Sequence, residues 1–388
     1  MSIGVLFFLC GCHREKSNID FSDHAATLLD STLAYYKVPD RNLFYETFPK
    51  RDGDLVTYLA GADTIRKNRV AYLWPTSGMF SALNALLETT GNQKYEQMIQ
   101  SVILPGLECY YDSLRVPACY QSYLTESGKA DRFYDDNLWL GLDFLDLYKQ
   151  TGDSACLALA RNIWSFIESG CDSILGGGVY WCEQKKESKN TCSNAPAVVL
   201  ALKLYSVTKE KHFFEMGQKL YDWTKEKLKD PSDYLYYDNL TLDGQVNKTK
   251  FPYNAGQMLQ ASVLLYNLTK QNSYLDEAQR LASACSQYFF ENFVSDDKKS
   301  FRAIKNGNIW FVAIMLRGFE ELYKVDHNPV YLNDFRNTLQ YMWAHNANHN
   351  RLFEDDCFVE KKNENKETKW LLTQAAMIEM YARLARIK

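Results

Sequence analysis

The sequence is poor in the residues that break helices. Among 388 residues there are only 19 glycines and 9 prolines, and a turn-dense all-β sandwich would need more of both. The chain also lacks a strong net charge, since its formal value is −4. No basic patch stands out, so nucleic acid is not an expected partner. The composition therefore favours a folded chain of long helices.

Metal-binding and membrane-spanning patterns are missing as well. There is no CxxC pair with a histidine partner, which argues against a zinc site. His345 and His349 are four residues apart, but no glutamate stands between them in an HExxH pattern. After the N-terminus, no stretch approaches 18 uncharged apolar residues. We therefore expect no transmembrane helix, no metal and no other cofactor.

The N-terminus carries a pattern of its own. A short apolar run from Ile3 to Leu9 is followed by Cys10-Gly11-Cys12. This resembles the signal of a bacterial lipoprotein, with Cys12 as the lipidated residue, although the usual positive flank is missing. A disordered apolar tail is the alternative. The prediction is a signal and tether over residues 1–18, a single domain over 19–388, and an exported lipoprotein of the periplasm or outer cell surface.

Eight cysteines remain after that segment, and an even number permits disulfides in an exported protein. Cys109 and Cys119 are close in sequence, as are Cys182 and Cys192. Spacing alone leaves both bonds open.

A repeat of 57–61 residues runs through the chain and predicts its fold. Similar segments such as ALLETTG, DLYKQTG and KLYSVTK place one marker residue at Leu87, Tyr148, Tyr205, Tyr266, Tyr323 and Tyr381. Each unit is expected to be a helix, a tight turn and a second helix. The marker-ending helices are predicted near 75–90, 135–151, 191–208, 251–270, 306–325 and 367–386. Their partners are predicted near 23–37, 92–112, 153–169, 210–228, 272–292 and 329–346.

Six such pairs suggest a closed, all-α (α/α)6 barrel. The marker-ending helices are poorer in charge, so we place them in the inner ring. An open solenoid is the alternative, but no polar capping repeat is evident. Long loops are predicted at 38–74, 113–134, 171–190, 229–250, 293–305 and 347–366. In a closed barrel all of them lie on the rim where inner helices begin, and loops on a rigid scaffold commonly carry function.

Aromatic and amide residues collect at the predicted inner-helix starts. The candidates for binding there are Trp74, Tyr134, Trp139, Tyr180, Trp181, Asn190, Asn194, Tyr253, Asn254 and Trp310. Flat rings stack on sugar C–H faces, and amides bind hydroxyls, so the mixture suits a neutral polyhydroxylated ligand. Taken singly, the polar residues could equally be helix caps. The triple glycine at 176–178 could be a turn or a close approach to a ligand.

Asp135-Asp136 is the best candidate for chemistry. Hydrolysis of a glycosidic bond usually uses two carboxyl groups, about 5–5.5 Å apart when configuration is retained. Adjacent residues in the first turn of a helix point about 100° apart, which permits that spacing. The helix N-terminus favours an ionised carboxylate, and mutual repulsion raises the second pKa. Glu354-Asp355-Asp356, also on the rim, is expected to be solvated loop charge, with a substitute role in the chemistry as the alternative.

Four segments together resemble glycoside hydrolase family 76, the endo-α-1,6-mannanases. Tyr134-Asp135-Asp136 followed by Trp139 is similar to its YDD-x-x-W signature. Residues 177–181 (GGVYW), 189–195 (KNTCSNA) and 253–256 (YNAG) are similar to three further segments of the family. Ala255 departs from the family, which has glutamine there, and the segment after Asn306 lacks the usual Phe-Lys-Gly.

The resemblance implies an (α/α)6 fold and retaining hydrolysis of an α-mannan or a related α-linked glycan. We expect the protein to be a monomer. It implies Asp135 as nucleophile, Asp136 as acid/base, and Asn194, Tyr253, Asn254 and Trp181 in the sugar sites. A sugar epimerase of the same fold would need histidines on inner helices, and none is predicted there. A non-catalytic glycan-binding lipoprotein remains the other alternative.

Overall fold

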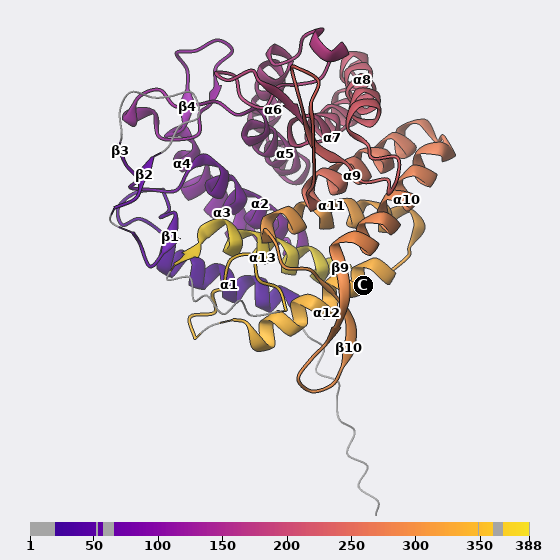
Figure 1. The fold of residues 1–388 in the computed structure, drawn as a ribbon. Coiled ribbons are helices and arrows are strands. Elements are labelled where there is room, and N and C mark those ends of the chain that lie inside the picture. The colour runs from indigo at the N-terminus through magenta and orange to yellow at the C-terminus, as the bar shows by residue number, and fades with distance from the viewer. Residues whose placement is uncertain (1–19, 52, 57–65, 348, 360–367, 388) are drawn as a thin grey trace, which may run out of the picture.

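The computed structural model describes residues 20–51, 53–56, 66–347, 349–359 and 368–387. Six helices form a closed inner ring (Figure 1). They are α2 (Leu73–Thr90), α5 (Tyr134–Thr151), α7 (Thr191–Thr208), α9 (Pro252–Thr269), α11 (Ile309–Asp326) and α13 (Leu371–Arg386). Each contacts the next in that order, and α13 contacts α2. This closure confirms the predicted barrel and excludes an open solenoid.

An outer ring of helices covers the inner one. Its members are α1 (Phe21–Tyr36), α3 (Gln93–Met98) with α4 (Leu104–Glu108), α6 (Ser154–Ser169), α8 (Lys211–Leu228), α10 (Asn272–Phe289) and α12 (Val330–His345). The first helix, α1, packs mainly on the last, α13. The Phe21 ring stacks on Tyr381, whereas the Tyr36 hydroxyl donates to the carbonyl of Lys369 at 3.0 Å. The start of α1 therefore lies at the end of α13.

The short turns between inner and outer helices repeat one geometry. The residue after each of the five helices α2, α5, α7, α9 and α11 is left-handed, with φ between 53° and 76°. These residues are Gly91, Gly152, Lys209, Lys270 and His327, and each donates its N–H to the marker carbonyl four residues earlier. In the first four turns a threonine hydroxyl also donates to the preceding leucine carbonyl. The repeated sequence segments thus correspond to turns that share the same local hydrogen bonds.

The long loops carry short strands that the helix pattern does not predict. They are β1 (Thr47–Phe48), β2 (Leu55–Val56), β3 (Arg66–Lys67), β4 (Tyr111–Asp112), β5 (Cys119–Tyr120), β6 (Ser188–Asn190), β7 (Tyr237–Thr241), β8 (Val246–Lys250), β9 (Phe290–Val294), β10 (Ser300–Ile304) and β11 (Lys369–Trp370). Antiparallel pairs join β1 to β11, β2 to β3, β4 to β5 and β9 to β10, and β6, β7 and β8 form one sheet. All these loops lie on the rim where inner helices begin, as predicted.

Several predicted boundaries were wrong for local reasons. The helix expected over 92–112 ends at Glu108 and is interrupted by a π-helical turn at Ile99–Ile103, just before Pro105. Proline lacks the N–H that a regular α-turn needs there. The helix expected over 272–292 ends at Phe289 because β9 begins at the next residue. Within the described ranges, no helix is long and apolar enough to span a bilayer.

Candidate active site

A cavity of about 470 Å³ opens on the long-loop rim. It is lined by Tyr72, Trp74, Ser122, Phe133, Asp135, Asp136, Trp139, Trp181, Ser188, Asn190, Cys192, Asp238, Asn239, Phe251, Tyr253, Trp310 and Phe311. Eight of these were candidates from the sequence: Asp135, Asp136, Trp74, Trp139, Trp181, Asn190, Tyr253 and Trp310. The fold thus gathers one set of residues from the starts of α2, α5, α7, α9 and α11.

The two adjacent carboxyl groups lie in the first turn of α5, where they face different surroundings. Oδ2 of Asp135 accepts a hydrogen bond from Nε1 of Trp181 at 3.1 Å. Burial raises the pKa of Asp135, and interactions with the Cys192 thiol and the Trp181 indole oppose that rise. Burial also raises the pKa of Asp136 to well above its usual range, and repulsion from Asp135 adds to it. Asp135 therefore ionises first, and Asp136 retains its proton to higher pH.

Aromatic rings form one wall of the cavity. Trp310 meets Trp74 and Trp139 edge to face, with ring centroids 5.3 Å and 4.9 Å away. The Tyr253 ring stacks on Phe311 at 4.0 Å, with the two planes 7° apart. Rings held by one another in this way keep their orientation, which suits a surface for sugar stacking.

A second group of lining residues is polar and partly comes from a loop. Strand β6 brings Ser188 and Asn190, and β7 pairs with it so that Asn239 lies opposite Asn190. Oδ2 of Asp238 accepts bonds from the side-chain amides of Asn239 at 2.8 Å and Asn247 at 3.2 Å. Burial raises the pKa of Asp238. Sequence reasoning missed Asp238 and Asn239 because nothing in the helix repeat marks a position on the β7–β8 hairpin.

Four residues predicted to bind sugar lie outside the set that lines the cavity. The Tyr134 ring stacks on Phe166 with centroids 4.6 Å apart. The Tyr180 hydroxyl donates to Oδ2 of Asp172 at 2.7 Å. Asn194 binds the backbone of Val179. Asn254 is fully buried in α9.

Asn194 belongs to a repeated amide clamp at the inner-helix starts. Its Nδ2 donates to the carbonyl of Val179 at 2.9 Å, and its Oδ1 accepts from the Val179 N–H at 2.7 Å. Asn137 of α5 binds the backbone of Tyr120 in the same way, and Gln374 of α13 binds that of Phe353. These amides hold the preceding loop against its helix. In the corresponding position of α9 stands Ala255, which has no amide.

Two other interpretations are corrected by the contacts. The glycines at 177 and 178 lie against the Trp223 indole, where a Cβ on Gly178 would come within 2.7 Å of the ring. Their close approach is therefore to protein and not to a ligand. Asp355 is not a solvated charge, because its Oδ1 accepts from the Trp370 N–H at 3.0 Å and the Thr373 hydroxyl at 2.6 Å.

Side-chain capping accounts for little of the polar character at this rim. Of the six inner helices, only α11 has a side-chain cap, from Asn308; the starts of α2, α5, α7, α9 and α13 show none. Asp135 and Asp136 lie just after the N-cap of α5, Phe133, and neither is its capping residue. Neither of the close cysteine pairs, 109/119 or 182/192, forms a disulfide.

Comparison with known protein families agrees with this geometry. The model of glycosyl hydrolase family 76 matches residues 21–382. The chain belongs to glycosyl hydrolase family 76. Among solved structures, it is similar to a family 76 glycoside hydrolase from a bovine strain of Bacteroides thetaiotaomicron, at 33% identity and a TM-score of 0.85 over 95% of this chain and 78% of that one.

Two further proteins are similar to this chain. A family 76 glycoside hydrolase described as a mannosidase, from Bacteroides thetaiotaomicron VPI-5482, is 30% identical with a TM-score of 0.86 over 94% of this chain and 98% of that one. A putative mannan endo-1,6-α-mannosidase of Schizosaccharomyces pombe is 27% identical over 62% of this chain. The chain spans only 54% of that relative's length.

Proposed function

We propose that this protein is a retaining glycosidase that cleaves the α-1,6-linked backbone of a mannan or a related α-linked glycan. The observation that carries the proposal is the pair Asp135-Asp136, which shares a cavity with an aromatic wall while its two carboxyl groups differ in proton affinity. The mannosidase and mannan endo-1,6-α-mannosidase descriptions of two family relatives support the choice of linkage.

The environments assign a role to each carboxyl group. Asp135 holds a hydrogen bond from Trp181 and lies at the positive end of α5, so it is the group that is ionised and attacks the anomeric carbon. Asp136 keeps its proton and donates it to the leaving oxygen. A glycosyl-enzyme forms on Asp135, and Asp136 then removes a proton from the water that hydrolyses it. Two displacements at the same carbon retain the α configuration.

The substrate class follows from the cavity walls. Among the described residues, those that line the cavity include no lysine or arginine but three carboxyl groups, which favours a neutral glycan over a phosphorylated or carboxylated one. Trp74, Trp310 and Tyr253 offer ring faces and edges, and Asn190, Asn239 and Asp238 offer hydrogen-bond partners for hydroxyls.

The test is product analysis on a panel of α-mannans, with Asp135→Asn and Asp136→Asn as matched variants. We expect short mannose oligomers from a 1,6-linked backbone, with the α anomer formed first in NMR spectra, and loss of release in both variants. An initial β product would contradict retention. Binding of the glycan by the wild-type protein without any product would favour the glycan-binding alternative.

We also propose that residues 19–388 act as one catalytic domain, as a monomer, on an exported bacterial lipoprotein. The lipoprotein part of this proposal rests on the N-terminal pattern, and Cys12 lies outside the described residues. Metabolic labelling with a radioactive fatty acid tests it: the wild-type chain should be labelled and Cys12→Ala should not. An unlabelled wild-type chain would contradict the anchor.

A further inference from the structure

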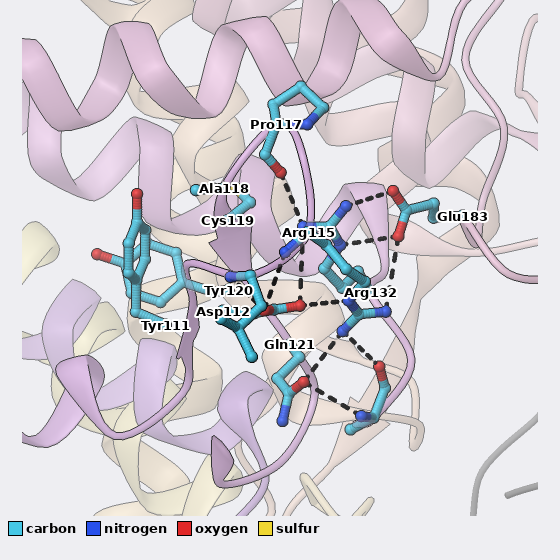
Figure 2. Close-up of polar contacts among 12 residues, drawn as sticks. Tyr111, Asp112, Arg115, Pro117, Ala118, Cys119, Tyr120, Gln121, Arg132 and Glu183 are labelled. Atoms are coloured by element: carbon cyan, nitrogen blue, oxygen red, sulfur yellow. Dashed lines mark hydrogen bonds and ion pairs between the residues drawn. The ribbon is translucent and has the colours of Figure 1, made fainter. Parts of the chain in front are cut away.

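A partly buried cluster of charged side chains joins two of the long loops (Figure 2). The Arg132 side chain is fully buried, and its Nε donates to Oε2 of Glu183 at 2.8 Å while Nη2 contacts Oε1 of the same carboxylate. Its Nη1 donates to the carbonyl of Pro117 at 2.8 Å. Arginine therefore binds glutamate through two parallel bonds, the geometry that fixes orientation best.

A second ion pair completes the cluster. The guanidinium of Arg115 contacts Asp112, and its Nη2 donates to Oε1 of Gln121 at 3.0 Å and to the carbonyl of Ala130 at 2.8 Å. Nη1 of Arg115 lies 3.7 Å from Glu183. Two arginines and two carboxylates thus balance in charge. They tie the loop after α4 to the loop before β6.

The cluster is joined to Asp135 through the backbone. The Glu183 N–H donates to the carbonyl of Arg132 at 3.0 Å, and the Tyr134 N–H donates to the carbonyl of Trp181 at 3.0 Å. These bonds align residues 132–134 with residues 181–183. Arg132 stands three residues before Asp135, and Glu183 stands two residues after Trp181. The same alignment carries the Trp181 indole to Oδ2 of Asp135.

A shared aromatic contact fixes the orientation of the first segment. The Arg132 guanidinium lies over the Phe166 ring at 4.8 Å, and the Tyr134 ring stacks on the same phenylalanine at 4.6 Å. Phe166 belongs to the outer helix α6. Residues 132 and 134 are therefore held against α6 on one side and against residues 181–183 on the other.

The Arg132–Glu183 ion pair is not explained by a contribution to folding stability alone. Removing charges from water is costly, and apolar replacements of buried ion pairs are often neutral or stabilising. What an Arg–Glu pair adds is a fixed direction and register. We infer that the Arg132–Glu183 ion pair is a positioning device that places the Trp181 indole on the Asp135 carboxylate. Its effect on turnover rests on the proposed function; its effect on the Trp181–Asp135 hydrogen bond does not.

A spectroscopic experiment tests the positioning without activity. The indole N–H signal of Trp181 in a ¹⁵N-labelled sample is assigned by its loss in Trp181→Phe. In the wild type we expect this signal to shift with pH as Asp135 titrates. In Glu183→Gln, which keeps the shape but loses the charge, and in Glu183→Ala, the shift should shrink and the signal should move toward the position of a free indole. An unchanged titration in a folded Glu183 variant would overturn the inference.

Kinetics supply the second readout. We expect Glu183→Ala to lower kcat by roughly 10- to 100-fold, with a smaller change in KM, because a small displacement at the reacting group is costly. The pKa that governs the acidic limb of the pH profile should rise, because the Asp135 carboxylate loses a hydrogen-bond donor. Among the described residues, the other ionisable groups that interact with Asp135 are Asp136 of α5, Cys192 of α7, Tyr253 of α9 and Cys182, and these variants leave all four in place.

A double variant and a distant control separate positioning from general stability. If Glu183 acts through Trp181, adding Glu183→Ala to Trp181→Phe should not shift the pKa of the acidic limb any further. Independent, additive shifts would overturn the inference. The control is Glu379→Gln, which weakens a more deeply buried pair with Arg317 (2.7 Å and 2.9 Å) between α11 and α13. It should lower the unfolding temperature and leave the pH profile in place.

Discussion

Asn194 and Val179 are joined by a pair of hydrogen bonds, of 2.7 Å and 2.9 Å, in which one amide side chain satisfies both backbone atoms of a buried loop residue. A third bond, of 2.8 Å, runs from the same amide to the carbonyl of Asn190. The arrangement explains why an asparagine in the first turn of an inner helix need not touch a ligand. Its partner is the loop that precedes the helix.

The first prediction concerns this clamp. Asn194→Ala should lower the free energy of unfolding by about 3 kcal/mol, because three bonds are lost and the N–H and carbonyl of Val179 stay buried without a partner. Asn92→Ala is the matched control. Asn92 is an exposed helix cap with a single bond to the Lys94 N–H at 3.0 Å, so we expect a loss of about 1 kcal/mol. Urea unfolding measures both, and equal losses would contradict the structural role.

The second prediction is that Asp136 destabilises the fold at neutral pH. An unfolded aspartate has a pKa of about 3.9, and the folded value lies well above it. In that interval the folded state binds the extra proton, so stability falls as the pH rises. Asp136→Asn escapes this loss and should be more stable than the wild type at pH 7, by about 1–3 kcal/mol.

Unfolding at pH 4 and pH 7 measures the difference, which should be small at the lower pH. Asp243→Asn is a control of opposite sign. The bonds that Asp243 accepts from Thr241 and the Gln245 N–H hold its pKa below the usual range, so its carboxylate supports the fold above pH 4. The second prediction fails if Asp136→Asn is no more stable than the wild type at pH 7.

The third prediction compares Gly170, which has no room for a side chain, with Gly152, which has room but a positive φ. A Cβ on Gly170 would come within 2.5 Å of the Tyr134 ring, and Tyr134 directly precedes Asp135 and Asp136. Gly170→Ala should therefore displace the start of α5 and lower kcat by roughly 10-fold or more. A Cβ on Gly152 would meet nothing within 4 Å, but its φ is 76°. Gly152→Ala should cost about 1 kcal/mol of stability and leave kcat unchanged, as assays on both variants would show.

The fourth prediction concerns Cys192, which lines the cavity beside Asp135. Burial and the nearby carboxylates hold the pKa of its thiol well above the usual value, so iodoacetamide should react slowly at pH 7. A small organomercurial, which binds thiols tightly, should inactivate the enzyme, and mannose oligomers should slow the inactivation.

Cys192→Ser should resist the mercurial, whereas Cys109→Ser, which changes a thiol outside the cavity lining, should stay as sensitive as the wild type. Residual activity followed over time measures all three proteins. Equal sensitivity of Cys192→Ser and the wild type would place the reactive thiol elsewhere.

The inner ring could be predicted from the sequence because its signals are local. The range expected for one helix, 191–208, matches α7 (Thr191–Thr208), and a left-handed residue after the marker ends each of the first five inner helices. Asp135 and Asp136 were found for the same reason, as an acidic pair at a helix start beside a tryptophan.

The remaining site residues depend on contacts between distant segments. Asp238 reaches the cavity because β7 pairs with β6, and no periodic pattern encodes that pairing. From the sequence alone, Asn194 could be a helix cap or a residue that binds sugar. Its partner in the structure is Val179, which lies 15 residues earlier. Tyr134 and Tyr180 likewise turned out to pack and bond within the protein, because aromatic composition does not state which way a ring faces.

The contact between Phe21 and Tyr381 has a consequence for how the enzyme meets a polymer. Through this contact, the start of α1 lies at the end of the barrel away from the cavity. Tyr36, at the other end of α1, contacts the start of α13. A lipid attached before Asp20, as the sequence predicts, would hold the molecule by its base. The mouth of the barrel would then face the surrounding medium, where a long glycan can thread across it without meeting the membrane.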